Sequence, residues 1–216
     1  MEQTVELRVL ELICSRLCHE LISPVTAVNN GMELLADGGS DMLEEVSDLI
    51  ATSAKETSGR LQYYRIAYGL GGQDAPPISI GEVRRLTEGI LGDGKVTVEW
   101  PSLEAGTDGG LGRRGMKLLL NALILAVEAL PRGGKLTLAL TPGALPAVAI
   151  TAAGKGARVE PASLDALNGA APVAQLTARN VHAYFTARVA EAAGSALDVA
   201  PGADQVAIRF AVGKPA

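Results

Sequence analysis

The sequence is poor in aromatic residues, which make up 3% of its 216 positions. With so few large rings, a core must be built from Leu, Ile, Val and Ala, which suits helix bundles and alanine-rich sandwiches. Hydrophobic residues still account for 48% of the chain and charged residues for 20%. This balance is typical of a folded globular protein and excludes extended disorder. The length allows one large domain or two small ones.

Basic clusters are also missing, because no more than two Lys or Arg residues are adjacent and the formal charge is −5. A nucleic-acid partner needs a basic surface that neutralises phosphates, so this class of partner is excluded. The chain has no uncharged apolar run of about 18 residues or more, the length that spans a membrane. Its first residues, MEQTVELRVLE, carry acids where a signal peptide carries bases. We therefore expect a cytoplasmic protein with no membrane contact.

The sequence has only two cysteines, Cys14 and Cys18, and Cys18 precedes one of the two histidines, His19. A metal site needs further ligands at suitable spacing, and the other histidine, His182, is far along the chain. We predict two partly buried thiols in a reducing compartment and no metal bound by this chain.

What the sequence does contain is an apolar heptad in its first 36 residues. One position of the heptad holds Leu7, Cys14, Leu21, Val28 and Leu35, and the other holds Leu10, Leu17, Pro24 and Gly31. The pattern predicts a helix over residues 5–36 that is packed along one stripe. In this register His19 lies almost opposite the stripe, with Arg16 and Ser23 on the same helix face and Glu20 beside it. An exposed imidazole on a rigid helix indicates a functional site.

A second apolar helix follows a glycine pair at 38–39, which would end the first. Ser40 or Asp41 would cap this second helix, and it would run to Gly69. The two helices form an antiparallel hairpin, which cannot enclose a core alone. We expect a homodimeric four-helix bundle. The alternative is that the hairpin packs on the C-terminal half of the same chain.

Beyond a Gly- and Pro-rich linker at 71–79, the pattern mixes helices and strands. Helices are predicted over 81–91, 112–130 and 173–193, and strands over 95–100, 135–140, 147–151, 196–199 and 205–212. These proportions favour a two-layer α/β sandwich. The predicted organisation is a helical domain at 1–72 followed by an α/β domain at 78–216.

The run from His19 to Pro24 resembles the phosphoacceptor motif of sensor histidine kinases, in which an acid follows the histidine and a proline stands five residues later. A more specific resemblance is to the histidine phosphotransferases of alphaproteobacteria. It is carried by SRLCHELISP (15–24), LIATSAKE (49–56), LQYYRIAYG (61–69) and LNALILAVEALPRGG (120–134). This resemblance covers nearly the whole chain.

The resemblance implies that the C-terminal half is a degenerate ATPase sandwich of the histidine-kinase (Bergerat-like) type. Kinases hold Mg-ATP with a helical asparagine pair, a D-x-G-x-G turn and a Gly-rich lid. Here Asn121 matches one asparagine, but Lys117 replaces its partner and Ala152 replaces the aspartate of the turn. No Gly-rich lid precedes residue 173. Because hydrogen-bonding groups for both adenine and phosphates are missing, we expect no bound ATP and no other cofactor.

The resemblance further implies that His19 takes a phosphoryl group from the receiver domain of a hybrid histidine kinase. It would pass the group to the aspartate of a response regulator's receiver domain, and the receivers would supply Mg²⁺. Glu20 would hydrogen-bond the imidazole or remain a solvated helix acid. Arg16 would hold the phosphoryl oxygens, and Ser23 would orient the group or simply precede Pro24.

Two other functions stay open at this point. One is an active histidine kinase with a divergent ATP site, and the other is a non-catalytic dimeric scaffold that binds receivers. We interpret His182, on a late helix, as structural.

Overall fold

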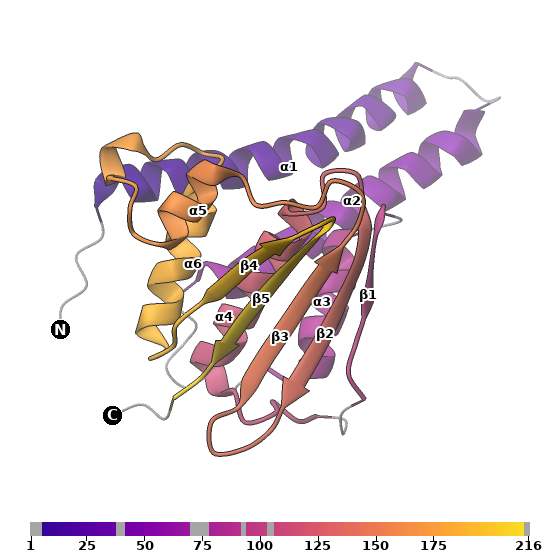
Figure 1. The fold of residues 1–216 in the computed structure, drawn as a ribbon. Coiled ribbons are helices and arrows are strands. Elements are labelled where there is room, and N and C mark those ends of the chain that lie inside the picture. Colours follow the sequence, from indigo (N-terminus) through magenta and orange to yellow (C-terminus); the bar gives the residue numbers. More distant parts are fainter. Residues whose placement is uncertain (1–5, 38–41, 70–77, 92–93, 103–105, 214–216) are drawn as a thin grey trace.

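The computed structural model describes residues 6–37, 42–69, 78–91, 94–102 and 106–213. It begins with two long helices, α1 (Leu7–Ala36) and α2 (Leu43–Ala67), which form the predicted hairpin (Figure 1). The helices approach closely at Gly31, where an added Cβ atom would lie 2.5 Å from Ile50 Cγ1. The predicted capping residues Ser40 and Asp41 lie outside the described residues.

The rest of the chain forms a mixed α/β unit. Its helices are α3 (Ile80–Leu91), α4 (Gly112–Glu128), α5 (Pro161–Leu167), the 3₁₀ turn η2 (Val173–Gln175) and α6 (Val181–Ala192). Its strands are β1 (Val96–Glu99), β2 (Gly134–Thr141), β3 (Ala147–Ala153), β4 (Asp198–Gly202) and β5 (Gln205–Ala211). The sheet order is β1-β2-β3-β5-β4, and only the β1–β2 pair is parallel.

One face of this sheet packs on α4 and forms the core. Alternating residues of each strand point to this face, so the register aligns Leu138 with Ile150 and Ile150 with Ile208 across three strands. Eleven residues of α4 are buried, Leu118, Leu119 and Leu120 among them. The core therefore lies between the sheet and α4, as expected for two layers.

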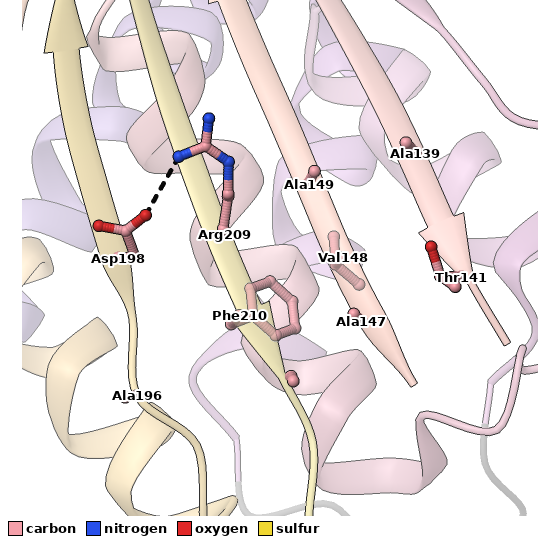
Figure 2. Close-up of a pocket in the computed structure, with 10 residues that line it drawn as sticks. Ala139, Thr141, Ala147, Val148, Ala149, Ala196, Asp198, Arg209 and Phe210 are labelled. Atoms are coloured by element: carbon pink, nitrogen blue, oxygen red, sulfur yellow. Dashed lines mark hydrogen bonds and ion pairs between the residues drawn. The ribbon is translucent and has the colours of Figure 1, made fainter. Parts of the chain in front are cut away.

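The opposite face of the sheet is lined by small side chains and holds a shallow hollow (Figure 2). Ala139, Ala149 and Ala147 contribute to its floor. Arg209 of β5 pairs with Asp198 of β4 at 3.1 Å beside it. Alanine and threonine leave little apolar surface here, so this face needs no covering layer.

The hairpin packs on the α/β unit at one end and projects beyond it at the other (Figure 1). At the packed end, Val9 and Ile13 of α1 and Tyr63 of α2 belong to the main core. The Tyr63 hydroxyl donates to the Leu120 carbonyl at 2.7 Å. The packed end of the hairpin therefore follows the alternative prediction, in which the hairpin packs on the C-terminal half of the same chain.

The observed elements differ from the predicted ones in three respects. The helix expected over 173–193 is two elements, η2 and α6, because the Asn180 side chain accepts hydrogen bonds from the Thr177 backbone and hydroxyl. Helix α5 was not predicted. The apolar heptad of α1 is buried only in part: Pro24 and Gly31 are buried as predicted, whereas Leu7 and Leu10 are exposed by 67% and 52%.

Candidate functional site

His19 lies in the middle of α1, and its side chain is exposed. The buried positions of α1 are Val9, Ile13, Pro24 and Gly31, so the packing of this helix does not use the histidine. An imidazole placed in this way is open to a reacting group on another protein. Ser23, one turn later on the same helix, is also exposed.

Glu20, the residue after His19, pairs with an arginine that the sequence analysis did not identify. Arg60 of α2 places Nη1 at 2.6 Å from Glu20 Oε2, and its Nη2 lies 2.7 Å from Glu56 Oε1. In this structure the Glu20 carboxylate therefore takes part in an ion pair between the two helices of the hairpin. The i, i+4 spacing of Glu56 and Arg60 was visible in the sequence, but the pairing across the hairpin was not.

Arg16, one turn before His19, forms an ion pair with Glu128 at the end of α4. Its side chain is only 12% exposed. The sequence analysis placed this guanidinium beside the histidine, as a group that holds phosphoryl oxygens. In this structure its ion pair with Glu128 joins the hairpin to the α/β unit.

The second histidine, His182 of α6, is fully buried. Its Nδ1 lies 3.0 Å from the Tyr68 hydroxyl and its Nε2 lies 3.1 Å from the Asn121 carbonyl. Burial raises the pKa of Tyr68, so the phenol keeps its proton and donates to Nδ1. Burial, with the nearby charge of Arg16, lowers the pKa of His182 to about 3. His182 is therefore a neutral structural residue, in agreement with the sequence interpretation.

Two residues of α4, which the sequence analysis compared with the kinase asparagine pair, bind the end of α2. Asn121 Nδ2 donates to the Ala67 carbonyl at 2.8 Å, and Lys117 Nζ donates to the Gly69 carbonyl at 2.8 Å. Carbonyls at the end of a helix and just beyond it have no partner within that helix, so these side chains act as a C-terminal cap. Burial lowers the pKa of Lys117.

The end of β3 and the segment before α6 are the other two places that the sequence analysis compared with a kinase. Ala152, which the sequence analysis compared with the kinase aspartate, lies within β3, is fully buried and offers only a methyl group. Arg8 of α1 donates to the Val173 carbonyl at 3.1 Å and to the Leu176 carbonyl at 2.9 Å. These two hydrogen bonds hold the segment before α6 on α1.

The prediction that the cysteines are partly buried was wrong, because Cys14 and Cys18 are both exposed. Within the described part of the chain, no group of three or more His, Cys, Asp or Glu residues could hold a metal ion. None of the helices in these residues is long and apolar enough to cross a membrane.

Comparison with known proteins assigns the class. Residues 80–205 match the family model described as the histidine phosphotransferase C-terminal domain. The chain belongs to the histidine phosphotransferase family, and its role is that of a transferase.

Among individual proteins, the chain is similar to the protein phosphotransferase ChpT of Brucella abortus (strain 2308). The two are 37% identical over 196 residues, which cover 90% of this chain and 91% of that protein. The chain is also similar to a solved 1.7 Å structure of a bacterial phosphotransferase, with a TM-score of 0.80 and 35% identity. That match covers 97% of this chain and 98% of the other.

Proposed function

We propose that this protein is a relay intermediate in which His19 carries the phosphoryl group. It receives the group from an aspartyl phosphate on the receiver domain of a hybrid histidine kinase and passes it to the aspartate of a response regulator. The observation that carries this proposal is the exposed imidazole of His19 on α1, in a chain of the histidine phosphotransferase family. In this proposal the protein acts in the cytoplasm.

The proposed reaction has two reversible steps. A lone pair on an imidazole nitrogen attacks the phosphorus, a P–N bond forms, and the P–O bond to the donor aspartate breaks, which leaves a carboxylate. The second step reverses these bond changes on the acceptor aspartate. Such transfer depends mainly on in-line positioning and charge stabilisation. The receiver domains would contribute Mg²⁺, and this chain would contribute an oriented histidine.

Transfer without ATP is supported by the contacts of the α4 residues. Lys117 and Asn121 already bond the end of α2, and Ala152 has no group for an adenine amine. A nucleotide would have to displace these hydrogen bonds. The residues present do not fit Mg-ATP, so no step of the proposed mechanism uses it.

The roles of the three residues near His19 remain proposals. Ser23 is exposed one turn away and is free to orient the phosphoryl group. For Arg16 to contact that group, its ion pair with Glu128 has to open. Glu20 is held by Arg60, so a contact with the imidazole requires the carboxylate to change partner.

Receiver domains would dock beside His19 on the hairpin. Ile22 of α1 is 59% exposed and Leu61 of α2 is 51% exposed. Apolar side chains next to the reacting group would give a receiver an anchor, which is how interfaces concentrate their binding energy.

The projecting part of the hairpin supports the proposed homodimer. A stripe with spacings of three and four residues stays exposed or half-buried on α1, and it consists of Cys14, Cys18, Leu21, Val25, Val28, Met32 and Leu35. This is the heptad spacing of a bundle interface. A second hairpin would cover the stripe and complete a four-helix core.

The proposed function is tested with a receiver domain carrying a labelled aspartyl phosphate. We expect label on the wild-type chain in a form that is labile to acid and stable to base. His19→Gln should abolish it, and His182→Gln should retain it. Label that survives His19→Gln would refute the assignment of His19.

The two alternative functions, an active kinase and a non-catalytic scaffold, predict different results. An active kinase would acquire label on His19 from ATP and Mg²⁺ without any receiver. A non-catalytic scaffold would bind receivers while phosphate flow between them stayed the same in wild type and His19→Ala. Either result would replace the relay proposal.

The dimer is tested by light scattering with size-exclusion chromatography. Val25→Glu places a charge in the stripe and should shift the protein from dimer to monomer. Leu145→Glu, at a residue that is 64% exposed outside the hairpin, is the control and should leave the dimer intact. A wild-type monomer at micromolar concentration would contradict the proposal.

A further inference from the structure

Pro24 leaves an unsatisfied backbone acceptor one residue after His19. In an α-helix each N–H donates to the carbonyl four residues earlier, and proline has no N–H. The carbonyl of Glu20 therefore has no donor from residue 24. Arg60 Nη1, from α2, lies 3.0 Å from this oxygen and donates to it.

The same guanidinium binds two carboxylates. Nη1 also contacts Glu20 Oε2 at 2.6 Å, and Nη2 and Nε contact Glu56 Oε1 at 2.7 and 3.1 Å. Arg60 is 22% exposed, so this network is partly shielded from water. Four contacts of this kind require the planar, multi-donor fork of arginine, which lysine does not have.

We propose that Arg60 is a positioning residue for phosphoryl transfer at His19. It binds both the backbone carbonyl and the carboxylate of Glu20. In this way it fixes the helical turn between His19 and Pro24, and with it the position of the imidazole. The inference rests on the proposed function. In-line transfer depends on placement, since an error of about 1 Å costs about 100-fold in rate.

Steady-state transfer from a phosphorylated receiver domain tests this role. Arg60→Met should lower kcat by about 10- to 100-fold and change KM less than about twofold, because docking is kept and orientation is lost. Arg60→Lys should recover only part of kcat. The matched control is Arg84→Met, which removes an exposed i, i+4 pair with Glu88 on α3 and should leave both constants unchanged.

A double-mutant cycle with Pro24→Ala distinguishes a positioning role of Arg60 from a role in which it only joins α1 to α2 and stabilises the hairpin. Alanine restores an N–H to the Glu20 carbonyl, so Pro24→Ala should raise kcat in the Arg60→Met background. Additive effects of the two changes would overturn the proposal. So would a rise in KM at unchanged kcat, or a loss of activity that follows the unfolded fraction measured by circular dichroism.

The proposed relay function and the positioning role of Arg60 would be refuted by different results. If the wild-type chain accepts no phosphate from any receiver while it is folded, the proposed function fails. If the wild type is active and Arg60→Met is equally active, only the positioning role fails.

Discussion

The two histidines of this chain lie in opposite surroundings. His19 is exposed on α1, and the hairpin packs without it. His182 is fully buried on α6, between the Tyr68 hydroxyl and the Asn121 carbonyl. The difference separates a histidine that a partner can reach from one that holds the hairpin on the α/β unit.

The same contrast extends to the two ends of the hairpin. At the packed end, Tyr63 and Tyr68 make hydrogen bonds with the α/β unit, and the surrounding side chains are buried. At the projecting end, apolar residues such as Val25 and Met32 are exposed by 42% and 54%. One end is thus packed within the chain, whereas the other leaves apolar side chains exposed, where we propose that a second hairpin binds.

The largest expected effect is on transfer activity. His19→Gln should remove phosphate acceptance entirely, because no nucleophile remains at the site, and should change the free energy of unfolding by less than about 0.5 kcal/mol. Labelled transfer and urea denaturation of the same preparation measure both quantities. A folded His19→Gln protein that keeps its activity would break the contrast between the histidines.

His182→Ala should show the reverse pattern. It leaves the Tyr68 hydroxyl without its acceptor in the core, removes one of the contacts of the Asn121 backbone carbonyl and opens a cavity, so we expect a loss of about 2 to 4 kcal/mol in unfolding free energy. Phosphate acceptance per folded molecule should stay close to wild type. A loss of activity without a loss of stability would place His182 in the transfer reaction.

Stability should also depend on pH through His182. Its pKa is about 3 in the folded chain, against an ordinary value of 6.5. Between these two pH values the imidazole is protonated in the unfolded chain and neutral in the folded chain. Stability is therefore fully present above pH 6.5 and falls as pH is lowered toward 3, by about 2 kcal/mol between pH 6.5 and 5.

Urea denaturation at these two pH values measures the change. His182→Gln has no titrating group at this position and should flatten the dependence. An equally steep dependence in His182→Gln would show that other groups cause it.

The smallest expected effect is at the hydroxyl of Tyr68. Tyr68→Phe removes the donor to His182 Nδ1 but keeps the ring, which stacks on Tyr64. We expect a loss of about 1 kcal/mol in unfolding free energy, the usual value of one hydrogen bond. Tyr184→Phe, on a half-buried ring of α6, is the control and should lose less.

Most helices and strands were predictable because their patterns are local. The heptad located α1 within two residues, and alternation located β2, β3 and β5 within about the same margin. Helix α5 was missed although Pro161 at its first turn and Asn168–Gly169 at its end are usual boundary signals. The helix expected over 173–193 was wrong because one side-chain contact, from Asn180 to Thr177, interrupts an otherwise continuous pattern.

The surroundings of the candidate site were less predictable than its central residue. Arg16 was expected to face the phosphoryl group, but its partner Glu128 lies 112 positions away in the sequence. Arg60 was not identified, because its contact with Glu20 joins two helices across 40 positions. Cys14 and Cys18 were expected to be partly buried, but both are exposed.

The sequence by itself determined the helix that carries His19, the exposure of that side chain and the α/β character of the second half. These features follow from periodicity and turn chemistry, which act over a few neighbouring residues. Only the tertiary structure decided which carboxylates the arginines bind, and that Lys117 and Asn121 cap α2. Such pairings depend on how distant segments approach each other, and a linear pattern carries no information on that distance.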